Sequence, residues 1–311
     1  GLVMELRRAG NHGLNLSRIG LGTMTWGRDT DESEAAEQCR IYIEAGGNFI
    51  DTAAVYGSGD SERVVGGLIG ALFKRDEVVI ATKAGISIND GIRTVNTSRG
   101  ALLSELDASL KRLGTDYVDL WQVHTWDDQT PIDDTLSALE TAYQSGKARY
   151  VGVSNYSGWQ IAYSAIKAPI ATIQNEYSLL NRDPEREVLP ACDHLGIGFL
   201  AWSPLGRGVL TGKYRNGIPS DSRAASAHFA NFVEGFLDDK SRTIVEAVQV
   251  AADGLGYSPT EVALSWVRDS FGVTSAIVGA RTAAQLRGSI RAEEISLPDI
   301  VRQALNEISA I

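Results

Sequence analysis

The chain has 311 residues, of which 43% are hydrophobic and 22% are charged, a composition typical of a globular protein. Its formal charge of −10 argues against nucleic acid as a partner, because phosphate binding requires a basic surface. No apolar run reaches the roughly 18–20 residues that cross a bilayer, and Gly1–Gly10 lacks the apolar core of a signal peptide. We therefore expect a cytoplasmic protein with no membrane partner, in which Gly1–Val3, ahead of Met4, is an extraneous tag.

Cys39 and Cys192 are the only cysteines of the sequence, too few for a disulfide framework or a zinc cluster. Both lie in segments of helical period, which favours packed thiols and leaves a nucleophilic role as the alternative. We accordingly expect a reducing compartment and a site without metal.

Short apolar segments alternate along the whole chain with longer segments of helical period. Several of the short segments are apolar throughout, as expected for parallel strands that are buried on both faces. The eight predicted strands are Arg18–Leu21, Asn48–Ile50, Val78–Thr82, Tyr117–Val123, Tyr150–Val153, Ala171–Ile173, Gly198–Trp202 and Thr274–Val278.

The segments between these strands are predicted to be helices. In the clearest example, leucines recur at spacings of three and four between Ser98, the expected N-cap, and Gly114, the expected stop. Similar patterns predict helices near Glu32–Ala45, Glu62–Leu72, Asp133–Gln144, Trp159–Lys167, Glu185–Leu195 and Ala283–Arg291.

Eight strands that alternate with helices leave two α/β architectures, an open doubly wound sheet and a closed barrel. A Rossmann sheet requires a G-x-G-x-x-G turn after its first strand, and Gly20–Thr25 lacks the third glycine. Because no other strand end supplies this motif, we predict a (β/α)8 TIM barrel that forms a single domain over residues 1–311.

Three segments exceed the basic repeat of a barrel. Leu2–Arg8 and Gly13–Ser17 are expected to form an N-terminal β-hairpin that plugs the bottom of the barrel. Leu205–Asp239 is a long loop after the seventh strand, and its length favours a lid or a disordered segment. Pro298–Ser309 is expected to form an extra C-terminal helix.

A polar residue or a glycine directly follows every predicted strand. In a parallel barrel the carboxyl ends of the strands meet at one rim, where barrels of this type carry out their chemistry. The sequence therefore predicts a functional site at this rim. The residues are Gly22 and Thr23, Asp51, Lys83, His124, Ser154 and Asn155, Gln174, Ser203 and Gly279.

A tyrosine and three neighbouring rim residues suit one chemistry, although each has an ordinary alternative. Asp51 can cap a turn, His124 can be structural, and Tyr56 can be a turn aromatic. Lys83 has the strongest signal, because a buried lysine requires an anion such as Asp51. Its ammonium is expected to lower the pKa of Tyr56 from about 10 toward the working range. Such a group can protonate an oxygen that becomes negative as hydride reaches its carbon, with His124 positioning that oxygen.

Three segments that hold these residues, Asn48–Gly59, Ile80–Lys83 and Asp119–His124, resemble the aldo-keto reductase family. The resemblance runs from about Met4 to the last helix and includes the branch of potassium-channel β-subunit-like reductases. It implies NADPH-dependent reduction of small aldehydes or ketones. In this scheme Tyr56 is the general acid of reduction and the general base of oxidation. The implied catalytic tetrad is Asp51, Tyr56, Lys83 and His124.

The same resemblance implies a site for NADPH or NADP+. Ser154, Asn155 and Gln174 match residues that bind the nicotinamide carboxamide, and Tyr177 matches the ring on which nicotinamide stacks. Arg281 is expected to bind the 2′-phosphate, which favours NADPH over NADH. The expected cofactor contacts are Gly22, Thr23, Met24, Asp51, Ser154, Asn155, Gln174, Tyr177, Ser203, Pro204, Leu205, Arg207, Gly208, Leu210, Lys213, Gly279, Arg281 and Gln285.

The chain departs from the family pattern at the expected adenine contact. Gly288 and Ser289 stand where the family commonly has an acid and an asparagine, so the sequence leaves adenine binding and cofactor selectivity open. Trp26 and Trp126 are expected walls of the substrate pocket, with core packing as the alternative. Phe229 or Phe232 from the long loop are further candidates.

Two other functions are compatible with the sequence. In a Schiff-base aldolase Lys83 would be the nucleophile, although a neighbouring Asp51 would keep it protonated. An NADPH-binding regulatory subunit with little turnover would retain the same residues, because channel-associated β subunits resemble this family. The natural carbonyl substrate, the preferred direction and the oligomeric state stay open.

Overall fold

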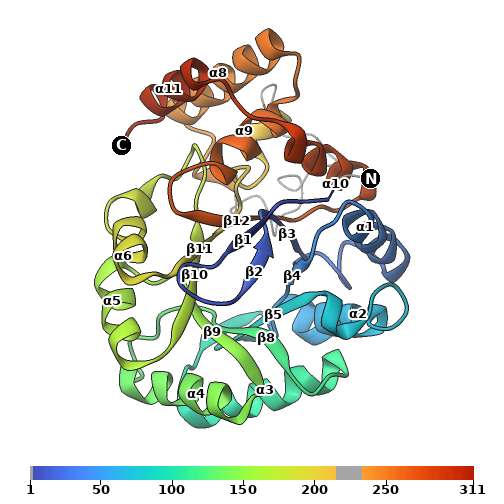
Figure 1. Ribbon diagram of the computed structural model, residues 1–311, viewed down its shortest axis with the longest axis vertical. Helices are drawn as coiled ribbons and strands as arrows, with labels where there is room; N and C mark the ends of the chain where they lie inside the picture. The colour runs from blue at the N-terminus through green and yellow to red at the C-terminus, as the bar shows by residue number, and fades with distance from the viewer. Residues whose placement is uncertain (1–2, 215–232) are drawn as a thin grey trace.

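The computed structural model describes residues 3–214 and 233–311, within which eight parallel strands form a closed barrel (Figure 1). Strand β12 pairs with β3 through Ala276 and Ile19, which closes the ring. The predicted (β/α)8 barrel is confirmed, and each predicted strand overlaps an observed one. The strands are β3 (Ile19–Gly22), β4 (Phe49–Asp51), β5 (Val79–Ala84), β8 (Val118–Val123), β9 (Ala148–Ser154), β10 (Ile170–Glu176), β11 (Gly198–Trp202) and β12 (Val273–Val278).

Helices surround the barrel, and the predicted C-terminal helix is present as α11 (Asp299–Ile308) (Figure 1). Helix α3 ends at Gly114, whose φ of 67° suits a glycine, whereas the Ser98 side chain makes no capping bond. The helices around the barrel are α1 (Glu32–Glu44), α2 (Asp60–Leu68), α3 (Arg99–Leu113), α4 (Ile132–Ser145), α5 (Gly158–Lys167), α6 (Val188–Leu195), α8 (Asp239–Leu255), α9 (Pro259–Arg268) and α10 (Ala283–Ile290).

Helices α8 and α9 were not predicted from the sequence. Every residue of Val262–Arg268 in α9 is buried, and a short, mostly apolar run of this kind cannot be assigned to a helix rather than a strand from the sequence pattern alone. Its start nevertheless has a clear signal, because Ser258 and Glu261 form a capping box around Pro259.

The predicted N-terminal hairpin is confirmed as β1 (Leu6–Arg8) and β2 (Asn15–Ser17), which lie over the centre of the barrel in Figure 1. Its buried side chains join the apolar layer inside the barrel, so the hairpin closes the amino-terminal end. That layer consists of Ala9, Leu14 and Leu16 from the hairpin segment with Phe49, Ala81, Leu120, Leu200 and Ile277 from the strands.

A second hairpin, β6 (Ile86–Asn89) and β7 (Ile92–Val95), follows β5 and was not predicted. Asp90 and Gly91 between its strands have φ values of 51° and 77°. An Asp-Gly pair between two strands is the usual signal for such a tight turn, so the sequence did contain this information.

The predicted lid, Leu205–Asp239, includes residues 215–232, which lie outside the described part of the chain, as do Phe229 and Phe232. The lid and the role of these phenylalanines stay predictions. No helix among the described residues is long and apolar enough to span a membrane. Cys39 and Cys192 are buried, and burial raises the pKa of each thiol to about 12, as expected of packed thiols.

Candidate active site

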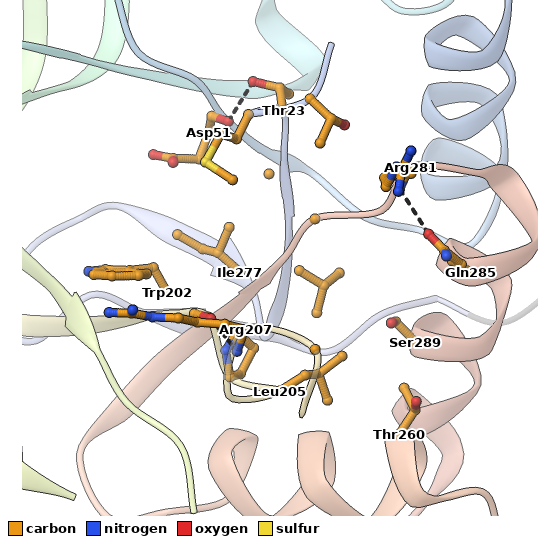
Figure 2. Close-up of a pocket in the computed structure, with 18 of the residues that line it drawn as sticks. Thr23, Asp51, Trp202, Leu205, Arg207, Thr260, Ile277, Arg281, Gln285 and Ser289 are labelled. Carbon is orange, nitrogen blue, oxygen red and sulfur yellow. Dashed lines mark hydrogen bonds between the residues drawn. The ribbon is translucent and has the colours of Figure 1, made fainter. Parts of the chain in front are cut away.

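A cavity of about 520 Å³ lies at the carboxyl ends of the strands, where Gly22 ends β3, Asp51 ends β4 and Ser154 ends β9. Its lining contains all four predicted catalytic residues. It also contains every expected cofactor contact except Tyr177 and Leu210, and part of it is drawn in Figure 2. The rim of the barrel therefore brings together residues that are up to 269 positions apart, between Gly22 and Arg291.

Lys83 lies at the centre of a buried polar cluster. Its Nζ donates to Asp51 Oδ2 at 2.5 Å, to the Thr52 carbonyl at 3.2 Å and to the Tyr56 hydroxyl at 3.3 Å. An ammonium ion has three donors, so these contacts use all of them. Burial disfavours the charge of Lys83, but Asp51 and Tyr56 outweigh it and raise the pKa of this lysine. Lys83 is consequently a protonated, fully bonded ammonium.

Tyr56 follows β4 in a tight turn, Tyr56–Gly59, that leads directly into α2. Desolvation raises the pKa of its hydroxyl by more than the Lys83 charge lowers it. The predicted lowering of this pKa is therefore wrong, because the sequence shows the neighbouring ammonium but not the loss of water. The result is a neutral phenol at ordinary pH, which holds a proton to donate.

His124 follows β8, and its backbone N–H donates to the Ala84 carbonyl at 2.8 Å. Its ring faces Tyr56 edge-on, with the ring centroids 6.0 Å apart and the planes at 82°. Burial lowers the pKa of His124 well below its usual 6.5, and the charges of Lys83 and Arg93 act in the same direction. His124 is therefore a neutral imidazole that can donate one hydrogen bond and accept another.

Two buried glutamines hold the other oxygen of the Asp51 carboxylate. Gln122 Nε2 donates to Asp51 Oδ1 at 3.1 Å, and Gln174 Nε2 donates to the same atom at 3.2 Å. Gln174 Nε2 also donates to Gln122 Oε1 at 3.0 Å. The sequence analysis did not select Gln122, although a glutamine inside the otherwise apolar segment Leu120–Val123 is a visible signal.

Tyr177 does not reach the cavity, and the prediction that it lines the cofactor site is wrong. Its ring packs in the core against Phe199 and Trp266, and its hydroxyl donates to Glu185 Oε2 at 2.6 Å. Gln174 lies within β10 and lines the cavity, whereas Tyr177 is the first residue after β10 and is buried in the core.

Trp202, the last residue of β11, presents the aromatic ring at this part of the cavity instead (Figure 2). Its Nε1 donates to Asn155 Oδ1 at 2.9 Å, while Asn155 Nδ2 donates to the His124 carbonyl at 2.9 Å. The indole is thus tied to the loop that carries Ser154 and Asn155. The sequence analysis missed this residue although it directly precedes Ser203.

Neither of the two tryptophans expected in the substrate pocket lines the cavity. Trp26 is fully buried and donates from Nε1 to Gln38 Oε1 at 3.2 Å. Trp126 packs edge-on against Tyr156 and Trp159, with centroid distances of 5.1 and 5.3 Å. The core-packing alternative therefore holds for Trp26, and Trp126 belongs to an aromatic cluster that packs against the core. Leu210 is likewise fully buried in the main core rather than in the lining.

The loop after β11 lies along one side of the cavity and is fixed by polar contacts. Ser203 Oγ accepts from the Arg207 backbone N–H at 2.8 Å, and both residues have φ values near +55°, at 50° and 58°. The Arg207 guanidinium forms a two-point ion pair with Glu176, with contacts of 2.8 and 3.0 Å. Because Glu176 balances its charge, Arg207 contributes less positive potential to the cavity than the sequence indicated.

The outer end of the cavity carries further polar and basic side chains. The backbone N–H of Arg281 donates to Gln285 Oε1 at 2.9 Å, as Figure 2 shows. Gly288 also lines this end, and a Cβ atom on it would lie 3.5 Å from Arg291 Nη2. A side chain at position 288, where the resemblance leads one to expect an acid, would therefore be in van der Waals contact with an arginine. Lining residues absent from the predicted set are Thr25, Trp202, Thr211, Ser258, Thr260, Ile277, Val278, Ala284, Gly288, Ser289 and Arg291.

Comparison with known proteins identifies this arrangement. A sequence model of the aldo/keto reductase family matches residues 18–310. The chain belongs to the aldo/keto reductase family. The predicted family is thereby confirmed, and its relatives that are named as oxidoreductases support an oxidoreductase.

Several relatives of this aldo/keto reductase match nearly its whole length. The uncharacterized oxidoreductase YrpG of Bacillus subtilis (strain 168) is 39% identical, over 98% of this chain and 96% of that protein. The L-glyceraldehyde 3-phosphate reductase of Escherichia coli (strain K12) is 36% identical, over 93% and 87%. A probable voltage-gated potassium channel subunit beta of Arabidopsis thaliana is 35% identical, over 99% and 96%. The relatives therefore include both enzymes and channel subunits.

The cavity of this aldo/keto reductase has donors that fit a nicotinamide dinucleotide phosphate. Ser154 Oγ is buried in the lining and has no hydrogen-bond partner, so a polar ligand group would satisfy it. Trp202 offers an aromatic face near the catalytic cluster, and Arg281 and Arg291 supply positive charge at the outer end. A dinucleotide carries an amide and an aromatic ring at one end and phosphate toward the other. These groups would meet Ser154 and Trp202 at one end of the cavity and the two arginines at the other.

Proposed function

We propose that this aldo/keto reductase reduces aldehydes or ketones to alcohols, reversibly, with NADPH as the hydride donor and Tyr56 as the proton donor. The observation that carries the proposal is the chain of contacts from Asp51 through Lys83 to the Tyr56 hydroxyl, inside the cavity. A neutral phenol held by an ammonium can release its proton to an alkoxide, because the ammonium stabilises the phenolate that remains.

Each residue of the tetrad has a separate part in this proposal. Tyr56 donates the proton in reduction and accepts it in oxidation. Lys83 stabilises the phenolate, and Asp51 keeps Lys83 charged and in place. His124, as a neutral imidazole beside the Tyr56 ring, donates a hydrogen bond to the carbonyl oxygen.

The remaining lining supports a site for the cofactor, which supplies hydride when bound. Ser154, Asn155 and Gln174 would hold the carboxamide, with Trp202 in place of Tyr177 against the nicotinamide ring. The loop residues from Ser203 to Gly208, with Lys213, would bind the pyrophosphate through backbone N–H groups and positive charge. Arg281 would pair with the 2′-phosphate and so select NADPH.

The state of Lys83 counts against the Schiff-base aldolase. A lysine nucleophile has to be neutral, and its pKa is then lowered. Here Asp51 and Tyr56 raise the pKa of Lys83. The regulatory NADPH-binding subunit is the second candidate, since one group of relatives is named as channel subunits.

The test follows NADPH absorbance with a panel of small aldehydes and ketones. We expect turnover by the wild type and a loss of about 10²–10⁴-fold in kcat for Tyr56→Phe, since this substitution removes the general acid. Tyr163→Phe is the matched control, because its hydroxyl bonds Asp133 on the surface, and it should retain activity. NADPH affinity should be similar in all three proteins. Tight NADPH binding by the wild type without turnover of any carbonyl would favour the regulatory subunit.

A further inference from the structure

The Asp51 carboxylate determines the direction of the hydrogen bonds around it. Lys83 occupies Oδ2, and Oδ1 faces the side-chain amides of Gln122 and Gln174 at 3.1 and 3.2 Å. A carboxylate in an ion pair with lysine only accepts hydrogen bonds. Each glutamine must therefore turn its donor, Nε2, toward Asp51 and its acceptor, Oε1, away from it.

Gln122 also constrains the orientation of the Gln174 side-chain amide. It is fully buried on β8, and its Oε1 accepts from Gln174 Nε2 at 3.0 Å. The two glutamines are on β8 and β10, and the strand between them, β9, carries Gly152 opposite Gln122. The two amides meet across β9, as the 3.0 Å contact between them shows. Both hydrogens of Gln174 Nε2 then have acceptors, Asp51 Oδ1 and Gln122 Oε1.

We propose that Asp51, acting directly and through Gln122, fixes which end of the Gln174 amide faces the cavity, namely the acceptor Oε1. Gln122 is then a positioning residue, and Asp51 has a role in ligand recognition besides its place beside Lys83. Gln174 lines the cavity next to Ser154, so its Oε1 selects a ligand group that carries an N–H. This inference rests on the proposed function, in which that group is the nicotinamide carboxamide.

Binding experiments on the wild-type protein can show whether Oε1 or Nε2 of Gln174 faces the cavity. Dissociation constants are measured by tryptophan fluorescence, without turnover, for NADP+ and two analogues. In one analogue an acetyl group replaces the carboxamide and has no N–H; in the other a thioamide retains the N–H. We expect the thioamide to bind about as well as NADP+ and the acetyl analogue about 3- to 10-fold more weakly, the effect of one lost hydrogen bond. Better binding of the acetyl analogue than of the thioamide would overturn the proposal.

Asp51→Asn tests the cause of this preference. Lys83 should take the asparagine oxygen in the place of Oδ2, which puts the asparagine nitrogen in the place of Oδ1. That nitrogen donates, so Gln122 and then Gln174 have to reverse, and Gln174 presents Nε2 to the cavity. We expect the preference for NADP+ over the acetyl analogue to disappear or invert in this variant. A preference unchanged from the wild type would refute the role of Asp51.

Two further variants serve as controls. Tyr56→Phe leaves the Asp51–Gln122–Gln174 contacts in place and should keep the wild-type preference, whereas Gln174→Leu should bring the ratio of the two constants near one. If Asp51→Asn does not fold, the wild-type ratios and Gln174→Leu still decide which atom faces the ligand. Absence of NADP+ binding in the wild type would instead overturn the proposed function, so the two failures are distinguishable.

Discussion

At the scale of single residues, the proton on the Tyr56 hydroxyl determines how the reaction should depend on pH. Desolvation raises the pKa of this phenol, and Asp51 and Tyr56 together raise that of Lys83. Burial lowers the pKa of His124 well below 6.5. Across neutral pH the three groups therefore keep one arrangement of protons: phenol, ammonium and neutral imidazole.

This arrangement predicts the pH dependence in both directions of the reaction. Reduction needs Tyr56 protonated, so its kcat/KM should be flat between about pH 7 and 9 and fall only above the ordinary tyrosine pKa of about 10. Oxidation needs Tyr56 to accept a proton, so its rate should rise with pH over the same interval. Rates of both directions between pH 5 and 11 test this. A reduction rate that falls steeply between pH 7 and 8 would contradict the raised pKa of Tyr56.

Individual residues also show what the sequence can and cannot predict about a site. Asp51, Lys83 and His124 were selected because each directly follows a predicted strand, and all four residues of the tetrad because their segments resemble one family. Tyr177 was chosen wrongly, since resemblance gives a residue's position in the chain but not the side to which it points. Tyr177 lies beyond the end of β10, whereas Trp202, the last residue of β11, is the ring that reaches the cavity.

The contact between α2 and α3 illustrates packing at the scale of elements. Gly66 and Gly67 are neighbours near the end of α2. A Cβ on Gly66 would lie 2.7 Å from the carbonyl oxygens of Arg112 and Leu113 in the last turn of α3, whereas a Cβ on Gly67 would meet nothing within 4 Å. Gly66 thus allows the close approach of the two helices, and Gly67 has no such function.

These adjacent glycines give a matched pair of substitutions. Gly66→Ala should destabilise the protein by about 1–3 kcal/mol, because the backbone of α3 has to move. Gly67→Ala should stabilise it by about 0.5–1 kcal/mol, because alanine favours a helix. Unfolding by guanidinium, followed by circular dichroism, measures both. Equal losses of stability in the two variants would show that the α2–α3 contact does not distinguish them.

Elements were predicted from the sequence where a short apolar run between turn residues, or a single helical period, was clear. The eight strands are such apolar runs because both of their faces are largely buried, and α3 has the helical period of its leucines. Helix α9 was missed because Val262–Arg268 is a short, buried and mostly apolar run, which fits a strand as well as a helix. The β6–β7 hairpin was missed for another reason: Asp90 and Gly91 signal the turn, but the strands beside them have only four residues each and mostly exposed side chains.

Cofactor binding should be visible at the scale of the whole molecule. The cavity joins the ends of all eight strands to α10, so a ligand that fills it stabilises the folded state as a unit. At 100 times its dissociation constant, NADPH should add about 2.7 kcal/mol of stability and raise Tm by several degrees.

The same measurement tests selectivity for NADPH. At equal concentrations NADH should raise Tm less than NADPH, because it lacks the phosphate that Arg281 is proposed to bind. In Arg281→Ala the affinity for NADPH should fall by about 10-fold or more, so the difference between the Tm shifts caused by NADPH and NADH should shrink. Equal shifts by NADH and NADPH in the wild type would remove Arg281 from the proposed phosphate site.

The hairpin β1–β2 has a consequence for the order of events in a catalytic cycle. Its residues Ala9, Leu14 and Leu16 close the amino-terminal end of the barrel, so both reactants must arrive and depart at the opposite face. The catalytic cluster lies at the bottom of the cavity on that face, and the dinucleotide would extend from this cluster to α10. A carbonyl bound first would obstruct the dinucleotide. We therefore expect compulsory-order kinetics, in which NADPH binds first and NADP+ leaves last. NADP+ should then inhibit competitively against NADPH and non-competitively against the carbonyl.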